Sequence, residues 1–235
     1  LGTRSIKKKL LQATTGGFLK NENKVTIVKA LDKVSFKLVK GDRLAIIGHN
    51  GAGKSTLLRV LAGAYQPSSG KLITKGQVTP LIDARIGSDE EATGFENIIL
   101  RGMYLGFSKA QMLERLDEIA AFADLGEFLH LPVHTYSSGM RIRLFFAITT
   151  MIKPEILIMD EWIATGDENF RAKADSKIKE IIANTNILVL ASHSKAIIEK
   201  WCNKAIWLEH GKIIEFGDFK PVFQAYQKTK KPKQN

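Results

Sequence analysis

Three short runs of consecutive apolar residues lie along the chain, at 44–47, 156–159 and 187–191. Such runs are typical of strands that are buried on both faces, as in a parallel sheet covered by helices. A glycine-rich turn and a helix-like stretch, Ser55–Ala64, follow the first run. Closely spaced β-branched and apolar residues in 25–39 and 72–82 predict edge β structure. The pattern therefore predicts an α/β protein with a mainly parallel core sheet.

A helical region, roughly 92–153, separates the first two of these strands. The stretch Ser108-Lys-Ala-Gln111 has the pattern of a capping box and predicts a helix to about Asp124. A second helix is predicted at Ser137–Ile152, with Pro154 as its stop. Its core-facing positions are Leu144, Phe145, Ile148 and Ile152. A helical subdomain is therefore expected to interrupt the α/β core.

Composition narrows the class of protein. Of the 235 residues 44% are hydrophobic and 25% charged, a balance typical of a globular protein. No apolar run approaches the ~20 residues of a membrane span. The chain has one cysteine, Cys202, which excludes a disulfide framework and fits a reducing compartment.

The net charge of +11 is concentrated at the two ends of the chain. Residues 1–9 and 228–235 carry several basic side chains and no acidic one, so the body between them is nearly neutral. The end at 228–235 is expected to be a mobile basic tail. The stretch Arg4–Leu11 has the pattern of a basic amphipathic segment, which is either a solvated helix face or a contact for anionic lipid headgroups.

A phosphate-binding motif follows the first predicted strand. Its residues are Gly48, His49, Asn50, Gly51, Ala52, Gly53, Lys54 and Ser55, in the pattern G-x-x-x-x-G-K-S. Glycines let the backbone curl so that N–H groups converge on a phosphate at a helix N-terminus. We expect Lys54 to reach the β- and γ-phosphates, Ser55 to coordinate Mg²⁺, and Thr56 to contact the α-phosphate side. The alternative is an ordinary glycine-rich turn, which the strand before it and the helix after it argue against.

Two carboxylates end the second predicted strand. Because ligands bind at the carboxyl ends of strands in open α/β sheets, Asp160 is expected in the Mg²⁺ shell and Glu161 as the general base. His193 directly follows the third strand and is expected to sense the γ-phosphate. The other histidines are not expected to form a metal cluster. They are His49, His130, His134 and His210.

The order of these motifs, with one more, resembles the ATP-binding-cassette (ABC) ATPases. The further motif is Tyr136-Ser137-Ser138-Gly139-Met140, which opens the second helix of the helical region. It differs from the common Leu-Ser-Gly-Gly-Gln and is similar to the form in ATPase subunits that export O-antigen, capsule or teichoic-acid polysaccharides. Three other stretches look like that subfamily, and the resemblance covers about 25–217. They are 160–170, 190–194 and 201–211.

The resemblance implies a single P-loop ABC ATPase domain over 1–235, with an antiparallel β edge and an inserted helical subdomain. It implies two such chains in a homodimer, with each ATP between one phosphate loop and the partner's Ser137–Met140. It also implies ATP and Mg²⁺ as cofactors and two integral-membrane permease subunits as partners. The polysaccharide would be contacted mainly by the permease. The expected location is the cytoplasmic face of the bacterial inner membrane, as a peripheral subunit.

Two departures from the ABC pattern lead to further expectations. Most cassettes carry a glutamine near residue 82, where Asp83 is expected to take its role as a Mg²⁺ sensor. The segment Ile86–Asn97 would then form the groove for the permease. No aromatic residue precedes Phe18, so the first strand and the adenine-stacking aromatic are expected upstream of residue 1. If the lysine-rich end is the natural one, the chain should not bind the glycan terminus itself.

Other functions remain open from the sequence. A cassette that moves a lipid or a drug would carry the same motifs. The net charge of +11 makes a nucleic-acid-associated ABC ATPase an alternative. Because the chain lacks the coiled coils, paired cassettes or zinc modules of that class, no nucleic-acid partner is expected. A P-loop kinase or GTPase is disfavoured by the signature helix and by the missing guanine-reading motif.

Overall fold

The computed structural model describes residues 18–22, 25–81, 87–151, 154–161 and 168–230, which form two compact units. Unit 1 takes its described residues from Leu1–Val78, Ile158–Trp162 and Asn186–Asn235, and unit 2 from Thr79–Leu157 and Ile163–Thr185. The helical region expected at 92–153 falls within the bounds of unit 2.

The three predicted core strands are confirmed as β3 (Arg43–Ile47), β5 (Ile156–Asp160) and β6 (Ile187–Ala191). They belong to a six-stranded sheet of order β4-β5-β6-β3-β7-β8. β3 runs parallel to β6, with Ile46 opposite Ala191. Leu44–Ile47 is almost fully buried, as the unbroken apolar run predicts for a strand covered on both faces.

The antiparallel edge of the sheet is formed by a hairpin that the sequence analysis did not predict. β7 (Lys204–Glu209) pairs in parallel with β3, and β8 (Lys212–Asp218) pairs with β7 in the antiparallel sense. The two-residue turn between them, His210-Gly211, has positive φ at both positions, 46° and 76°. A two-residue turn with this backbone matches the twist of paired strands. Two features of the sequence could have predicted this hairpin, namely Gly211 in the turn and the alternating pattern of residues in β8.

The predicted edge segments are only partly strands. β2 (Val25–Lys29) pairs antiparallel with β1 (Phe18–Glu22) in a separate two-stranded sheet, and residues 30–39 form no strand. Of 72–82, only β4 (Val78–Leu81) is a strand among the described residues. The residues before β4, at 72–77, are exposed. Ile73, for example, is 70% exposed, so its apolar side chain does not cover a core.

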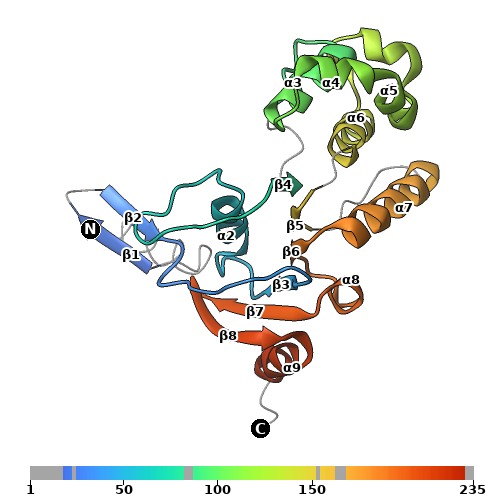
Figure 1. Ribbon diagram of the computed structural model, residues 1–235. Coiled ribbons are helices and arrows are strands. Elements are labelled where there is room, and N and C mark those ends of the chain that lie inside the picture. Colours follow the sequence, from blue (N-terminus) through green and yellow to red (C-terminus); the bar gives the residue numbers. More distant parts are fainter. Residues whose placement is uncertain (1–17, 23–24, 82–86, 152–153, 162–167, 231–235) are drawn as a thin grey trace. The chain divides into compact units, whose positions relative to one another are not determined.

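Three helices lie among the described residues of unit 1. They are α2 (Lys54–Leu61), α8 (Lys195–Trp201) and α9 (Phe219–Lys230). α9 lies against β7 and β8 (Figure 1). The rings of Trp207 on β7 and Tyr226 on α9 lie 5.8 Å apart. Because α9 reaches Lys230, the first three residues of the tail expected at 228–235 are helical, and 231–235 lie outside the described residues. Cys202 is buried beside these elements, and this burial raises the pKa of its thiol to about 12.

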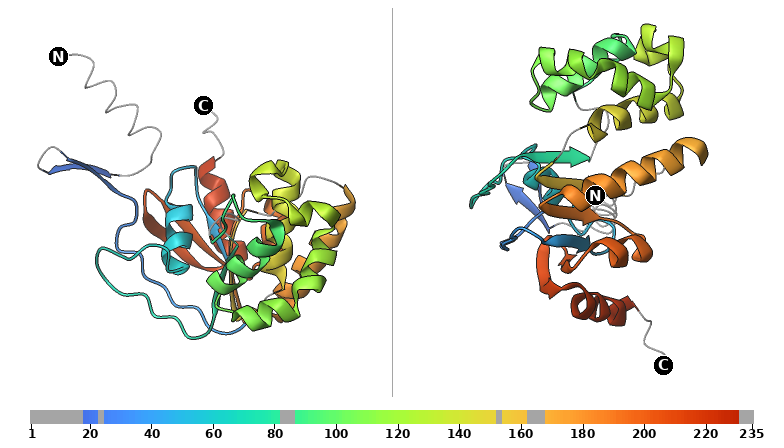
Figure 2. Two further views of the ribbon diagram at one scale, coloured as in Figure 1. Left: turned by 90° about the horizontal axis from the view of Figure 1, so that it is seen from above. Right: turned by 45° about the vertical axis from the view of Figure 1, so that its right-hand side comes forward.

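Unit 2 is mainly helical, and Figure 2 shows its helices in green and yellow, with the last of them, α7, in orange. They are α3 (Gly94–Tyr104), α4 (Lys109–Glu114), α5 (Leu116–Ala123), α6 (Ser138–Thr150) and α7 (Glu168–Asn184), with short 3₁₀ turns at Gly126–His130 and Val133–Thr135. Their core includes Ile98, Ile119, Leu144 and Ile148.

Both helix starts predicted in this region are confirmed, but the first helix is shorter than expected. Ser108 caps α4 in a full capping box with Gln111. The helix expected to run to about Asp124 is interrupted at Arg115, whose φ and ψ of −104° and 0° end α4 before α5 begins. Ser137 caps α6, while the predicted core residue Ile152 lies outside the described residues. Among all the helices described, we find none with both the length and the apolar composition to cross a bilayer.

Candidate nucleotide-binding site

The glycine-rich loop lies between β3 and α2, as its motif predicts. Gly53 has a φ of 105°, and a Cβ added there would lie 2.7 Å from the carbonyl oxygen of Ala30. A Cβ on Gly48 would collide with the carbonyl oxygen of Leu208. Glycine is required at both positions because a neighbouring backbone leaves no room for a Cβ. At Gly53 the left-handed φ favours glycine as well. The loop is therefore curled against its neighbours and leads into the N-terminus of α2.

Lys54 folds back over this loop. Its Nζ donates hydrogen bonds to the carbonyl oxygens of Gly48 and His49, each at 3.0 Å. The hydroxyl-bearing Ser55 is exposed in the first turn of α2, and Thr56 is half-buried beside it. An ammonium group held at the loop, next to a helix N-terminus, concentrates positive charge where a phosphate would bind.

Strand register brings the other predicted residues of unit 1 to the same edge of the sheet. Because Ile46 pairs with Ala191, the loop glycine Gly48 and His193 each lie two residues beyond that pair. The backbone N–H of Glu161 donates to the carbonyl oxygen of Ala191 at 2.7 Å, which joins the end of β5 to the end of β6. The carboxyl ends of three strands thus meet where ligands bind in α/β sheets.

Glu161 and His193 are neighbours at this edge. The Oε1 of Glu161 lies 3.7 Å from Nε2 of His193, and the hydroxyl of Ser192 donates to Oε2 of Glu161 at 3.4 Å. Both side chains are about half exposed, Glu161 at 53% and His193 at 57%, so their contact contributes little to stability. The sequence analysis did not identify Ser192 as a site residue. Its position between the third strand and His193 was the signal that could have identified it.

The backbone of Glu161 is strained. Its φ of 66° lies in the left-handed region, which costs a non-glycine residue about 1–2 kcal/mol. Such strain is found where a function requires the conformation. Here it turns the chain directly after Asp160, a half-buried residue at the end of β5. Asp83, the other predicted Mg²⁺ contact, lies outside the described residues.

The predicted signature residues open α6 in unit 2. The Oγ of Ser137 accepts a hydrogen bond from the backbone N–H of Met140 at 3.2 Å. Ser137 and Ser138 are exposed, and a Cβ added to Gly139 would meet only the Ser137 hydroxyl, at 3.9 Å. The helix N-terminus is therefore open on the side of these residues, as an anion-binding helix end must be.

The segment ahead of α6 is held by polar contacts within unit 2. Arg141 lies 3.1 Å from the carboxylate of Glu90 and donates to the carbonyl oxygen of His134 at 2.9 Å. The Tyr136 hydroxyl donates to the carbonyl oxygen of Phe128, and burial of this side chain raises its pKa. These contacts fix the start of the signature helix.

A capping box orders the segment that precedes α3. The backbone N–H and the hydroxyl of Thr93 both donate to the carboxylate of Glu96, each at 2.8 Å. These hydrogen bonds hold the pKa of Glu96 below its usual value, because they stabilise the charged carboxylate. The Glu96 backbone N–H donates in return to the Thr93 hydroxyl, which completes the box.

Two histidines that the sequence analysis treated separately lie together. The rings of His49 and His210 have centroids 4.8 Å apart, and the carboxylate of Glu209 is beside them. The sequence analysis expected no metal cluster among the histidines, but these two lie close enough to each other and to Glu209 for the three to offer ligand atoms to one ion. Their separation along the chain gave no signal, because the β3–β7 pairing brings them together.

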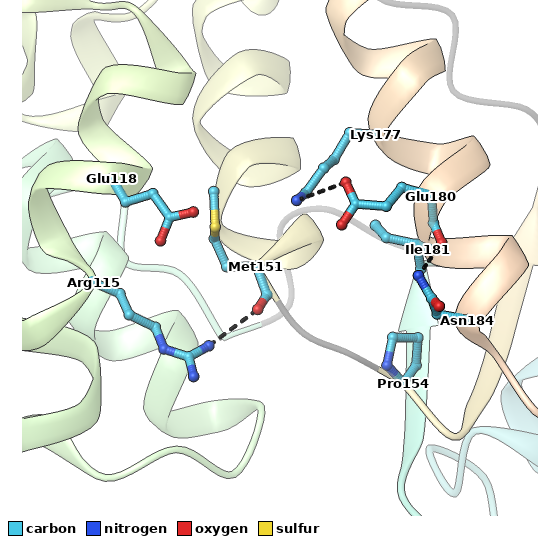
Figure 3. Close-up of a pocket in the computed structure, with 8 residues that line it drawn as sticks. All are labelled: Arg115, Glu118, Met151, Pro154, Lys177, Glu180, Ile181 and Asn184. Carbon is cyan, nitrogen blue, oxygen red and sulfur yellow. Dashed lines mark hydrogen bonds and ion pairs between the residues drawn. The ribbon is translucent and has the colours of Figure 1, made fainter.

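A pocket in unit 2 contains none of the predicted site residues (Figure 3). Arg115 donates to the carbonyl oxygen of Met151 at 3.1 Å on one side of it, and Lys177 pairs with Glu180 at 3.2 Å on the other. The remaining residues that line it are Glu118, Pro154, Ile181 and Asn184. Its charged groups are already paired in part, and nothing about it indicates a nucleotide.

Residues 31–164 match the family model described as ABC transporter, a stretch that includes the phosphate loop, the signature and the strand that ends in Asp160. The chain belongs to the ABC transporter family. It is an ATP-binding cassette and, as a member of this family, an ATPase.

Several curated relatives of this cassette are export proteins. It is 46% identical to the O-antigen export system ATP-binding protein RfbE of Yersinia enterocolitica, over 91% of this chain and 90% of that protein. It is 40% identical to RfbB of Myxococcus xanthus, over 87% of this chain and 47% of that protein. It is also 40% identical to the teichoic acids export ATP-binding protein TagH of Bacillus anthracis, over 84% of this chain and 36% of that protein. The cassette thus spans less than half of the latter two.

Solved structures show the same fold. An ATP-binding subunit of an ABC transporter matches with a TM-score of 0.68 and 22% identity, over 89% of this chain and 90% of that one. The cassette MJ0796, in a post-hydrolysis dimer bound to ADP and Pi, matches with a TM-score of 0.66 and 18% identity, over 87% and 97%. The predicted α/β fold of an ABC cassette is confirmed.

Proposed function

We propose that this cassette hydrolyses ATP to drive the export of a cell-surface polysaccharide, of O-antigen, capsule or teichoic-acid type, across the cytoplasmic membrane. The observation that carries the proposal is the 46% identity to an O-antigen export ATP-binding protein along nearly the whole length of both chains. Relatives at 40% identity include a further O-antigen protein and a teichoic acids protein, which broadens the substrate class rather than changing it.

The phosphate loop is the proposed ATP site. Its residues would donate backbone N–H groups to the phosphates, and Lys54, which already lies over the loop at 3.0 Å from two of its carbonyl oxygens, would turn to the β- and γ-phosphates. Two oxygen ligands fit a Mg²⁺ ion, the exposed hydroxyl of Ser55 and the carboxylate of Asp160. When bound, the ion would neutralise charge on the phosphates. Asp83 stays a proposed third contact.

Glu161 is the proposed general base. Its left-handed backbone turns it away from the direction of β5, and its carboxylate is half exposed, so a water molecule can reach it. Ser192 donates to one carboxylate oxygen and leaves the other near His193. In this role Glu161 accepts the proton of the attacking water, while His193 hydrogen-bonds the γ-phosphate.

A second copy of the cassette is the proposed partner of the signature helix. The N-terminus of α6 is open at Ser137–Gly139, and it carries the partial positive charge that favours an anion. The chain has its own phosphate loop for its own nucleotide. We therefore propose a homodimer in which Ser137, Ser138, Gly139 and Met140 contact the ATP bound by the other chain.

Two membrane permease subunits are the proposed further partners, which would place the cassette at the cytoplasmic face of the membrane. The segment predicted to receive the permease, Ile86–Asn97, is described from residue 87 and leads into α3. On one face of α3, Leu100, Met103 and Tyr104 are 43%, 49% and 56% exposed. Apolar side chains at this spacing form a continuous strip suited to a helix of the permease. The permease, not the cassette, would make most contacts with the polysaccharide.

Export is tested in cells of the source organism that lack the gene for this chain. We expect them to lose surface polysaccharide and to retain the polymer inside, as measured by surface labelling and by gel analysis of cell extracts. The wild-type gene should restore export, and so should Glu180→Gln, a matched change on α7. Glu161→Gln should not restore it. Normal surface polysaccharide in the deletion strain, with another exported compound retained instead, would contradict the substrate class.

A further inference from the structure

A cluster of metal-ligand type lies beside the phosphate loop. One ligand atom each from His49, Glu209 and His210 can be chosen so that all three lie within 4.8 Å of one another. His49 belongs to the loop after β3, whereas Glu209 ends β7 and His210 begins the turn to β8. This grouping needs no nucleotide and does not depend on the proposed function.

Backbone pairing holds the two parts of the cluster together. Ile47 pairs with Trp207 at the end of the β3–β7 ladder, so the residues that follow each strand are neighbours. The backbone N–H of Gly211 also donates to the carbonyl oxygen of Ala52 at 2.9 Å, which ties the β7–β8 turn to the phosphate loop. The three side chains therefore project from one rigid piece of backbone rather than from separate loops.

His49 is oriented as a metal-binding histidine. Its Nδ1 lies 2.7 Å from the carbonyl oxygen of Asn50, and because a carbonyl oxygen can only accept, Nδ1 is the donor in this contact. Nε2 is then the ring atom that is left to bind a metal. Metal-bound histidines are typically oriented by such a bond from the other ring nitrogen. Among the residues that the structure describes, no group donates a hydrogen bond to this Nε2, although the atom is buried.

His210 occupies a position that favours a different residue. Its φ of 46° is left-handed, and in a two-residue hairpin turn with glycine this place prefers asparagine, aspartate or glycine. The imidazole is 4.8 Å from that of His49, centroid to centroid. A histidine at this backbone position supplies a ring to the cluster that asparagine, aspartate or glycine would lack.

We propose that His49, Glu209 and His210 bind one divalent ion of the zinc class, with a water molecule as the fourth ligand. Two imidazoles and one carboxylate are a known donor set for tetrahedral Zn²⁺. Ligand atoms of such a site lie ~3.3 Å apart, given metal–ligand bonds of about 2.0–2.1 Å, so small side-chain rotations close the cluster. Nitrogen ligands favour Zn²⁺ over Mg²⁺, which prefers oxygen. The site is thus distinct from Ser55 and Asp160, and the bound ion would join the phosphate loop to the β7–β8 turn.

The test uses Co²⁺ as a coloured substitute for Zn²⁺, with the full chain in nucleotide-free buffer. We expect one Co²⁺ per chain and the intense visible absorption of tetrahedral coordination, which Zn²⁺ abolishes and Mg²⁺ does not. In His210→Asn the affinity should fall at least about tenfold, as for other changes at metal sites. Asparagine suits the left-handed turn, so the fold should be retained.

Two further variants make the result specific. Glu209→Gln keeps the shape of the side chain and should also weaken binding, whereas His134→Asn, a change of an exposed histidine in unit 2, should leave it unchanged. Zn²⁺ should raise the melting temperature of the wild type and of His134→Asn but not of His210→Asn. Equal Co²⁺ affinity in His210→Asn and His134→Asn, or an octahedral spectrum in the wild type, would overturn the proposal.

Discussion

The two units place their functional residues by different physical means. In unit 1 the phosphate loop, Glu161 and His193 follow parallel strands, so main-chain pairing such as Ile46 with Ala191 determines their positions. In unit 2 the predicted signature residues open a helix. The Ser137 hydroxyl oxygen, which accepts from the Met140 N–H, and the Arg141 side chain, which donates to the His134 carbonyl oxygen, hold that helix end.

The two units also differ in backbone strain. Glu161 has a left-handed φ of 66°, whereas none of the described residues 136–140 has a positive φ. A strained residue at a strand end is suited to chemistry, because the conformation aims one side chain. An unstrained helix end is suited to binding, because its N–H groups are already aligned. In the mechanism proposed above, hydrolysis depends on unit 1, and recognition of the partner's nucleotide depends on unit 2.

The largest effect is expected from Glu161→Gln. Removal of the general base should lower ATP hydrolysis by roughly 10²–10⁴-fold while nucleotide binding is kept. An ATP-bound dimer should then accumulate. Phosphate release and gel filtration with ATP and Mg²⁺ measure the two effects, and Glu180→Gln on α7 is the matched control. Undiminished hydrolysis in Glu161→Gln would remove the base assignment.

A pair of core truncations tests whether the units are separate in stability. Leu190 in unit 1 and Leu144 in unit 2 are both fully buried, so either change to alanine should cost about 2–5 kcal/mol in its own unit. Alkylation of Cys202, whose pKa of about 12 keeps the folded thiol unreactive, reports the opening of unit 1. We expect faster alkylation in Leu190→Ala than in Leu144→Ala. Equal rates would show that the units unfold as one.

The smallest effect is expected at the signature helix. Ser137→Ala removes the acceptor of the Met140 N–H and should destabilise α6 by about 1 kcal/mol. Amide hydrogen exchange at Met140 should become faster, whereas Ser137→Thr keeps the oxygen and should preserve most of the protection. Unchanged exchange in Ser137→Ala would mean that the cap does not hold this helix end.

Prediction from the sequence succeeded for those elements that a local pattern of residues is enough to determine. Unbroken apolar runs gave β3, β5 and β6, and the serines gave the starts of α4 and α6. It failed where exposure depends on distant parts of the chain. Residues 72–77 have a strand-like composition but are exposed and form no strand, and β8 is too polar and alternating to resemble a core strand.

The sequence by itself determined the chemistry available at the site, because the loop glycines, Lys54 and the Asp160-Glu161 pair are adjacent in the chain and their spacing reflects the backbone they require. Only the tertiary structure decided which distant groups meet. Ser192 and His193 reach Glu161 through the bond between the ends of β5 and β6. His49 meets Glu209 and His210 through the pairing of β3 with β7. Strand order sets these contacts, and strand order depends on how the whole core packs, not on any local run of residues.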